Sequence, residues 1–322
     1  MRKIRIDSSL EGKVNSFCKN LFSDRRFELP VVSLQNLTND HNRNFDQNER
    51  EYIEKIIRDY EFIIRAKPSE IQRLIGEFEN IILHNNLENE FCDLITTSMR
   101  YKEYRDREYL DFIKDMGINA CVYCNAQLTI VIDIRTIDHG PRAGQFEREG
   151  KFEVDHYYPQ SKYPFLCTSF YNLVPCCSNC NKAKSNTDTL FQLYSEDDDV
   201  DSFYFHIDEE SLDRYQKSRM RNDLEIHLNS KDGELIRNHL EIFRIDEIYA
   251  TQKDIAEEII IKSEAYTRAY KENLVNVFQD LFPDKALISR LLIGNYDTPE
   301  DIHKRPLAKF IQDLSKQVGL IQ

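Results

Sequence analysis

The chain has 322 residues, of which 41% are hydrophobic and 31% are charged, as in globular proteins with one large or two modest domains. No apolar run approaches the roughly 18 residues that a membrane span needs. The basic N-terminus lacks the apolar stretch of a signal peptide. We therefore expect a cytoplasmic protein that is not associated with a membrane.

The net charge of −13 is unevenly distributed. It is −3 over residues 1–120, zero over 121–190 and −10 over 191–322. A protein that held nucleic acid by broad electrostatics alone would be basic. Either a partner brings nucleic acid to this chain, or a local basic face is enough.

The first third is predicted to be helical. Residues 1–45 have weak periodicity, and the polar stretch 36–44 is expected to be a loop. Apolar residues spaced by three and four predict helices over 46–66 and from Pro68 to Ile82. A third helical stretch is expected over 87–116, with Gly117 as its stop. No obvious catalytic residue occurs in this region.

The pattern changes at Cys121. Strands are predicted at 128–134, 151–157 and 172–174, with a loop at 138–144 and a helix over 177–186. Neighbouring strand residues point to opposite faces, so Asp155 and His156 share a site only at a bulge or at the end of the strand. We therefore expect a bend at this step.

The last third is acidic and mainly helical. The run 196–201 is expected to be a solvated loop, and helices are predicted from Ile236 and over 255–277. The fold class is therefore α+β, a mainly α-helical chain with a central mixed module.

Two Cys-x-x-Cys pairs, Cys121/Cys124 and Cys177/Cys180, predict a structural zinc site. Each pair lets two thiolates reach one ion from a tight turn. A reducing compartment disfavours disulfides. Cys176 is left as a spare, because a second Cys-x-x-Cys pair requires Cys177.

Residues between the two pairs fit the cleavage of a phosphodiester. This reaction needs a water deprotonated near neutral pH, which suits His156. It also needs a hard cation to offset the phosphate charge. Asp155 and Asn181 offer the oxygen ligands that Mg²⁺ or Mn²⁺ prefers.

Asp155-His156, Asn172 and Asn181, framed by the two cysteine pairs, resemble the HNH endonuclease family with its zinc-bound ββα-metal, treble-clef-like core. The resemblance covers about residues 118–190. It implies that His156 is the general base and that Asp155 and Asn181 bind the catalytic metal. It also implies that Asn172 steadies the loop and the histidine.

Three further residues have two interpretations each. Glu153 shares a strand face with Asp155, so it either supports the metal or orients His156, or else has a plain surface role. Lys182 and Lys184 either contact phosphates or are solvated helix charges.

We accordingly expect a helical region at 1–117, an HNH core at 118–190 and an acidic region at 191–322 for docking or regulation. Segments 236–249 and 305–314 look similar to tails of HNH proteins in Septu-type anti-phage systems and some retrons. This resemblance implies a partner, a separate ATPase subunit encoded nearby. A DNA endonuclease is the first interpretation; a nuclease of RNA or tRNA and a non-catalytic zinc scaffold stay open.

Overall fold

The computed structural model describes residues 1–23, 27–140, 143–267, 270, 273 and 285–321. Helices and small two-stranded sheets share the chain, so the α+β class is confirmed. The helices are α1 (Ser8–Lys19), α2 (Pro30–Asn39), α3 (Gln47–Ile63), α4 (Pro68–Glu79), α5 (Asn89–Ser98), α6 (Tyr101–Glu103), α7 (Tyr109–Met116), α8 (Ser178–Lys184), α9 (Glu209–Ser218), α10 (Gly233–Phe243), α11 (Ile245–Ala250), α12 (Lys253–Ala265), α14 (Lys285–Ile293) and α15 (Ala308–Gln317). The strands are β1 (Ile4–Arg5), β2 (Ile130–Thr136), β3 (Phe146–Lys151), β4 (Glu153–His156), β5 (Leu173–Cys176), β6 (Tyr194–Ser195), β7 (Tyr204–Ile207) and β8 (Ile226–Asn229).

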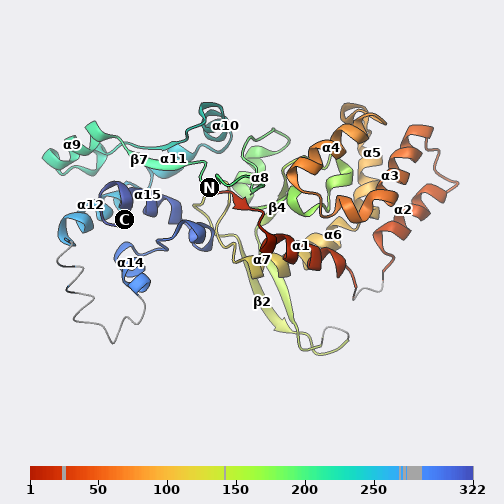
Figure 1. Ribbon diagram of the computed structural model, residues 1–322, viewed down its shortest axis with the longest axis horizontal. Helices are drawn as coiled ribbons and strands as arrows, with labels where there is room; N and C mark the ends of the chain where they lie inside the picture. The colour runs from red at the N-terminus through yellow and green to blue at the C-terminus, as the bar shows by residue number, and fades with distance from the viewer. Residues whose placement is uncertain (24–26, 141–142, 268–269, 271–272, 274–284, 322) are drawn as a thin grey trace.

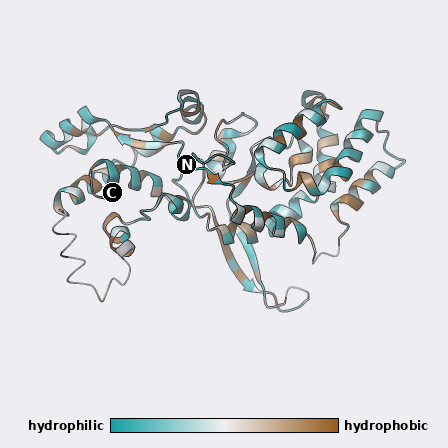
Figure 2. Cartoon of the chain, viewed as in Figure 1, coloured by the Kyte–Doolittle hydropathy of each residue, from teal (hydrophilic) through white to brown (hydrophobic). Residues whose placement is uncertain are grey.

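The helices α3 and α4 confirm the apolar periodicity of the first third. Asp46 caps α3 by accepting a hydrogen bond from the backbone N–H of Glu49, whose side chain bonds back to Asp46. Pro68 begins α4, where its missing N–H costs nothing. The apolar sides of both helices are buried, and Figure 2 shows the brown residues of these helices concentrated on one side.

Two expectations for this region were wrong. The weakly periodic N-terminus contains α1 and α2, and α2 includes the first part of the predicted loop at 36–44. The stretch 87–116 is not one helix, because Arg100 adopts a left-handed conformation with φ of 59° and donates from Nε to the Glu28 carbonyl at 2.9 Å. After this break the chain forms α6, a π-helical turn (Tyr104–Glu108) and α7, which ends at Gly117 with φ of 67°.

The centre of the molecule contains two antiparallel hairpins. The hairpin β2–β3 projects from the body in Figure 1. Its second strand, β3, was not predicted, since residues 138–150 lack an apolar alternation. Strands β4 and β5 pair Asp155 with Val174 and His156 with Leu173, and α8 packs against β4. This register has no shift, so β4 carries no bulge at Asp155; the strand does end at His156, which is the other arrangement that would let the two side chains share a site.

The C-terminal third surrounds the hairpin β7–β8 with helices. The run Glu196–Asp199 is exposed in a loop, as predicted. The helix predicted over 255–277 is observed as α12 and ends at Ala265; most of the remaining stretch lies outside the described residues. Within the described part of the chain, no helix is both long and apolar enough to cross a membrane.

Contacts join the three predicted regions through one continuous core. Strand β1 pairs in parallel with β6, which follows the central module in sequence. The backbone N–H groups of Asn119 and Ala120 both donate to the His303 carbonyl, at 2.7 and 2.9 Å. These contacts fix the cysteine-containing segment from both sides.

Candidate functional site

Four cysteines from two distant segments meet beside α8. All their sulfur atoms lie within 4.8 Å of one another, and all four residues are buried. The sulfurs of Cys124 and Cys177 are 4.0 Å apart. A tetrahedral Zn²⁺ with Zn–S bonds of about 2.3 Å would place its sulfurs about 3.8 Å apart. The geometry of the cluster therefore suits a zinc ion.

The sulfurs also accept backbone hydrogen bonds. The N–H of Cys177 donates to Cys121 Sγ at 3.3 Å, and that of Ala126 donates to Cys124 Sγ at 3.4 Å. Such bonds orient thiolates around a metal. The group contains Cys177 and not its neighbour Cys176, as the spacing predicts.

The first cysteine turn also reaches Asp155. Tyr123 lies between Cys121 and Cys124, is fully buried, and donates its hydroxyl hydrogen to Asp155 Oδ2 at 2.6 Å. The Tyr123 side chain thus links the Asp155 carboxylate of β4 to the turn that bears Cys121 and Cys124.

One face of β4 pairs with one face of α8. Asn181 donates from Nδ2 to Glu153 Oε2 at 3.3 Å. Three residues further along α8, Lys184 donates from Nζ to Asp155 Oδ1 at 3.2 Å. Residues two apart on a strand and three apart on a helix share a face, which explains why these two contacts lie one after the other between β4 and α8. The sequence analysis paired Asn181 with Asp155 as metal ligands. In the structure, the carboxylate that contacts Asn181 is that of Glu153.

Lys184 fits neither interpretation made from the sequence, a phosphate contact or a solvated helix charge. Its side chain is completely buried, and Nζ also donates to the His156 carbonyl at 2.9 Å. An ammonium enclosed in this way cannot touch a nucleic-acid backbone. Burial raises the pKa of Asp155, while the Lys184 ammonium and the Tyr123 hydroxyl oppose that shift. Lys182, in contrast, is exposed.

His156 points to the opposite face of β4 from Asp155, as strand alternation requires. Its Nε2 lies 3.1 Å from the Cys167 carbonyl, and Tyr101 packs against the ring at 4.8 Å between centroids. A carbonyl only accepts, so Nε2 carries the proton and Nδ1 keeps a lone pair. Burial lowers the pKa of His156 to about 4, and the charges of Lys184 and Arg105 act in the same direction. The ring is therefore neutral at neutral pH.

Asn172 connects the two ends of the β4–β5 loop. It is fully buried, accepts from the Tyr158 N–H at 2.8 Å, and donates to the carbonyls of Tyr158 and Leu166, each at 3.2 Å. Leu166 precedes Cys167, whose carbonyl binds His156. Asn172 thus steadies the loop segment that orients the histidine.

Oxygen atoms of the kind that a hard divalent cation prefers lie around α8, beside the Lys184 ammonium. Asp155 uses two of its roughly four lone-pair positions for Tyr123 and Lys184. Asn181 donates through its nitrogen, so its amide oxygen is available to a metal. Carboxylates and an amide oxygen are ligands for Mg²⁺ or Mn²⁺. Glu153, Asp155 and Asn181 are the residues that would hold such an ion.

The helical first third adds residues that the sequence reasoning missed. Tyr101 lies against His156, and the Arg105 guanidinium lies 5.8 Å from the centre of the Tyr101 ring. Both residues come from the segment of α6 and the π-helical turn. The interleaving of tyrosines and arginines over 101–107 is the sequence signal that points to this segment.

Comparison with known proteins gives one partial similarity. The chain is 32% identical over 76 residues to a Bacillus thuringiensis protein named Septu protein PtuB. These residues are 23% of this chain and 23% of the relative, so the match spans under a quarter of either protein. No protein-family model matches the chain, and no solved structure matches it. The chain is thus similar, over this stretch, to a protein named for the Septu system.

Proposed function

We propose that this protein is an HNH-type, metal-dependent endonuclease that hydrolyses phosphodiester bonds of DNA. The observation that supports it most is the neutral, carbonyl-oriented His156 on a strand whose other face bears Glu153 and Asp155 against α8. The cysteine cluster holds both this helix and Tyr123. A base and a set of hard oxygen ligands thus lie on one short strand, with the base at the residue where the strand ends.

In the proposed reaction, Nδ1 of His156 takes a proton from a water molecule. The water oxygen forms a bond to phosphorus as the bond from phosphorus to the leaving oxygen breaks, and the leaving oxygen takes a proton from solvent. Glu153, Asp155 and Asn181 would hold a Mg²⁺ or Mn²⁺ ion, whose charge would stabilise the phosphate and the leaving oxygen. Cys167 and Asn172 keep the imidazole oriented throughout, because their bonds do not involve Nδ1.

We further propose that the protein acts in anti-phage defence, with a separate ATPase subunit encoded nearby as its partner. The similarity to Septu protein PtuB supports this role. The acidic net charge of −13 also supports a partner, since such a chain attracts nucleic acid poorly by itself.

The first test is cleavage of supercoiled plasmid with Mg²⁺ or Mn²⁺, with and without the neighbouring gene product. We expect nicking by the wild-type protein. His156→Ala should lower the rate at least about 100-fold, because general-base catalysis contributes that much. Total RNA is offered in parallel, so that an RNA nuclease is recognised by its products.

His41→Ala is the control, since His41 is an exposed histidine in the loop before α3. It should cleave like the wild type. Zinc content and thermal unfolding of both variants are measured beside the rates. A folded, zinc-containing wild-type protein that cleaves neither DNA nor RNA with any of these additions would contradict the proposal.

A further inference from the structure

The π-helical turn Tyr104–Glu108 brings part of the helical region to the candidate active site. A π-helical turn is rare and often occurs at functional sites. Tyr104 and Tyr109, at its two ends, are buried at 1% and 0% exposure. Arg105, between these anchors, keeps 43% of its side chain exposed. The turn therefore presents an arginine from a fixed backbone.

Arg105 is connected to His156 through one aromatic ring. Its guanidinium lies 5.8 Å from the centre of the Tyr101 ring, and that ring lies 4.8 Å from the imidazole of His156. The charge of Arg105 acts on His156, and the charge of Glu153 acts on Arg105. Arg105 is thus near both the candidate base and the face of β4 that bears the carboxylates.

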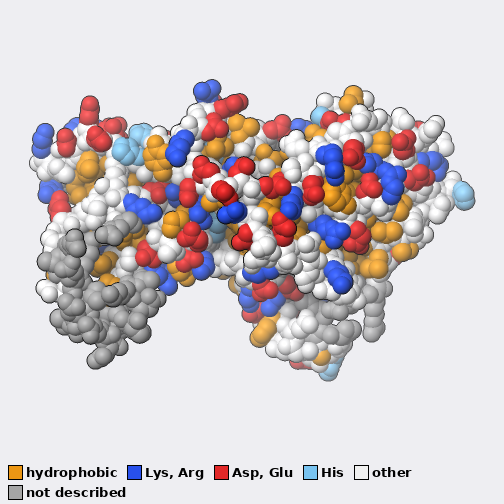
Figure 3. All heavy atoms as spheres, in the orientation of Figure 1, with side chains coloured by type: hydrophobic (Ala, Val, Ile, Leu, Met, Phe, Trp, Pro, Cys, Tyr) orange, Lys and Arg blue, Asp and Glu red, His pale blue; other side chains and the backbone are white. Residues whose placement is uncertain are grey.

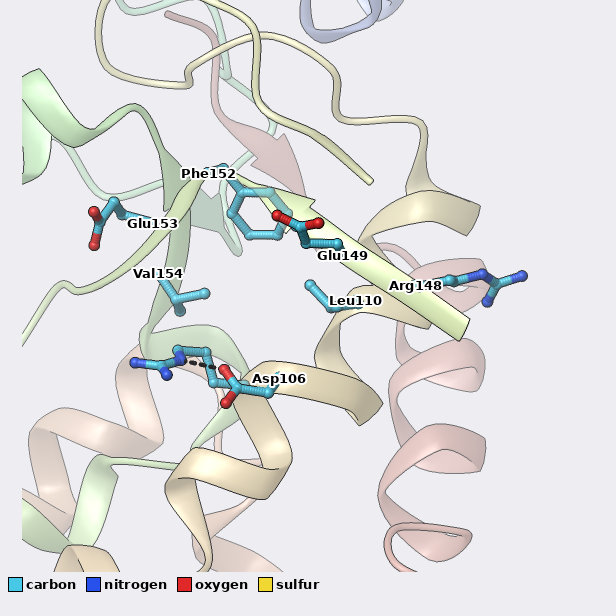
Figure 4. Close-up of a pocket in the computed structure, with 9 residues that line it drawn as sticks. Asp106, Leu110, Arg148, Glu149, Phe152, Glu153 and Val154 are labelled. Carbon is cyan, nitrogen blue, oxygen red and sulfur yellow. Dashed lines mark hydrogen bonds and ion pairs between the residues drawn. The ribbon is translucent and has the colours of Figure 1, made fainter. Parts of the chain in front are cut away.

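A groove of about 480 Å³ is lined by Arg105 and by Glu153 and Val154 of β4. Its walls come from the π-helical turn, α7, β3 and β4, and Figure 4 shows Val154 on the side of β4 that faces Leu110. Val154 and His156 share a strand face because they are two residues apart. The groove therefore reaches, at Val154, the strand face on which His156 lies two residues further along, although His156 itself does not line it.

Most charges in the groove already have partners. Arg148 pairs with Asp111 and Asp133, Lys151 pairs with Glu149, and Asn181 donates to Glu153. Arg105 donates from Nε to Asp106 at 2.7 Å. Within the described parts of the chain, its two Nη atoms have no partner. They form a fixed pair of donors at the edge of the groove.

We propose that Arg105 binds the scissile phosphate of a DNA strand lying in this groove. A guanidinium offers parallel N–H donors that match two phosphate oxygens. Asp106 and Tyr101 hold the guanidinium in one orientation, so it meets the phosphate with little loss of side-chain entropy. The inference rests on the proposed nuclease function and adds to it a substrate-binding residue from outside residues 118–190.

Arg105→Gln tests the proposal, and Arg219→Gln is a matched control. Arg219 keeps 54% of its side chain exposed, has the ring of Tyr215 at 5.8 Å, and pairs with the acidic Glu264. It belongs to the end of α9, away from the groove in Figure 1. We expect single-turnover cleavage of plasmid to slow about 100-fold in Arg105→Gln, as for the loss of one transition-state donor. Arg219→Gln should cleave like the wild type.

Binding of DNA is measured separately from cleavage, so that a failure of the proposed nuclease function is distinguished from a failure of the phosphate contact. A fluorescein-labelled oligonucleotide is titrated with His156→Ala and with the double variant His156→Ala/Arg105→Gln. Weaker binding by the double variant supports the phosphate contact even if no protein cleaves DNA. Zinc content and thermal unfolding establish that each variant is folded. If Arg105→Gln is unstable, Arg105→Lys takes its place. Lysine keeps the positive charge but lacks the paired N–H donors of a guanidinium, so this variant should show a smaller loss of cleavage rate and of oligonucleotide binding.

Two results overturn the inference. In the first, the wild type cleaves DNA and Arg105→Gln cleaves as fast as Arg219→Gln, which leaves the nuclease function intact. In the second, no protein cleaves DNA and the oligonucleotide binds equally well, or not at all, with and without Arg105.

Discussion

Asp155 is held by an unusual pair of neighbours for a proposed metal ligand. Lys184 and Tyr123 each bond to a different oxygen of its carboxylate, and all three side chains are buried. A buried carboxylate keeps its charge only with such partners, because transfer from water to the protein interior is costly. The helix residue Lys184 therefore stabilises the charge on β4, whereas the neighbouring Lys182 extends into solvent.

Lys184→Met should destabilise the protein by about 3 kcal/mol, since it leaves the Asp155 charge buried without its ion-pair partner. Lys182→Met, at an exposed position of the same helix, should change stability by less than about 0.5 kcal/mol. Urea unfolding at pH 7.5 measures both values. Equal stability of the two variants would show that the buried pair contributes little.

At the scale of elements, the cysteine cluster connects the turn 121–124 to α8. That helix has only 7 residues, too few to be stable in isolation. Its position depends on the cysteines at its start and on contacts with β4. Because Tyr123 belongs to the same cysteine turn, the cluster also positions Asp155. A zinc ion would therefore stabilise the hairpin and the helix together.

Cys180→Ser should lose about one equivalent of zinc per chain and several kcal/mol of stability, because structural zinc contributes directly to folding. If the proposed site at Asp155 binds Mn²⁺, that binding should weaken as well, since Tyr123 loses its support. Cys176→Ala removes a buried neighbour outside the cluster and should keep its zinc. Metal analysis and thermal unfolding distinguish the two, and zinc retained by Cys180→Ser would contradict the assignment.

At the scale of the whole molecule, the core is continuous from the first strand to the last helix. Figure 3 shows acidic and basic side chains interspersed on one face of the surface, without a continuous basic field there. Two buried histidines help to join the regions. His239 donates to the Tyr123 carbonyl at 2.9 Å, and His303 donates to the Arg2 carbonyl at 2.8 Å. Burial lowers the pKa of each to about 3.

These histidines should make stability depend on pH. The unfolded chain binds protons near the ordinary histidine pKa of about 6.5, while the folded chain binds them only near 3. Stability is therefore fully present above pH 6.5 and falls as the pH drops below it. Between pH 6.5 and 5.5, the free energy of unfolding of His303→Gln should fall by about 1 kcal/mol less than that of the wild type. Urea unfolding at both values checks this; identical pH slopes would contradict it, and exposed His41→Gln is the control.

Local pattern was enough to predict the helices α3 and α4, the strands β4 and β5, and the grouping of Cys121, Cys124, Cys177 and Cys180. These features depend on spacing along the chain: apolar residues three or four apart, and thiolates three apart in a tight turn. The break at Arg100 was not predictable in the same way, because the residue has a left-handed backbone and its side chain bonds to the carbonyl of Glu28, distant in sequence.

The sequence by itself determined the α+β class, the candidate zinc ligands and the candidate base His156. Only the tertiary structure decided that Glu153 contacts Asn181, that Lys184 is buried against Asp155, and that Arg105 lies beside the groove. The physical reason is that metal-ligand spacing and strand alternation are local properties. The partner of a side chain across a helix, a strand and a turn depends on packing between segments that are far apart in the chain.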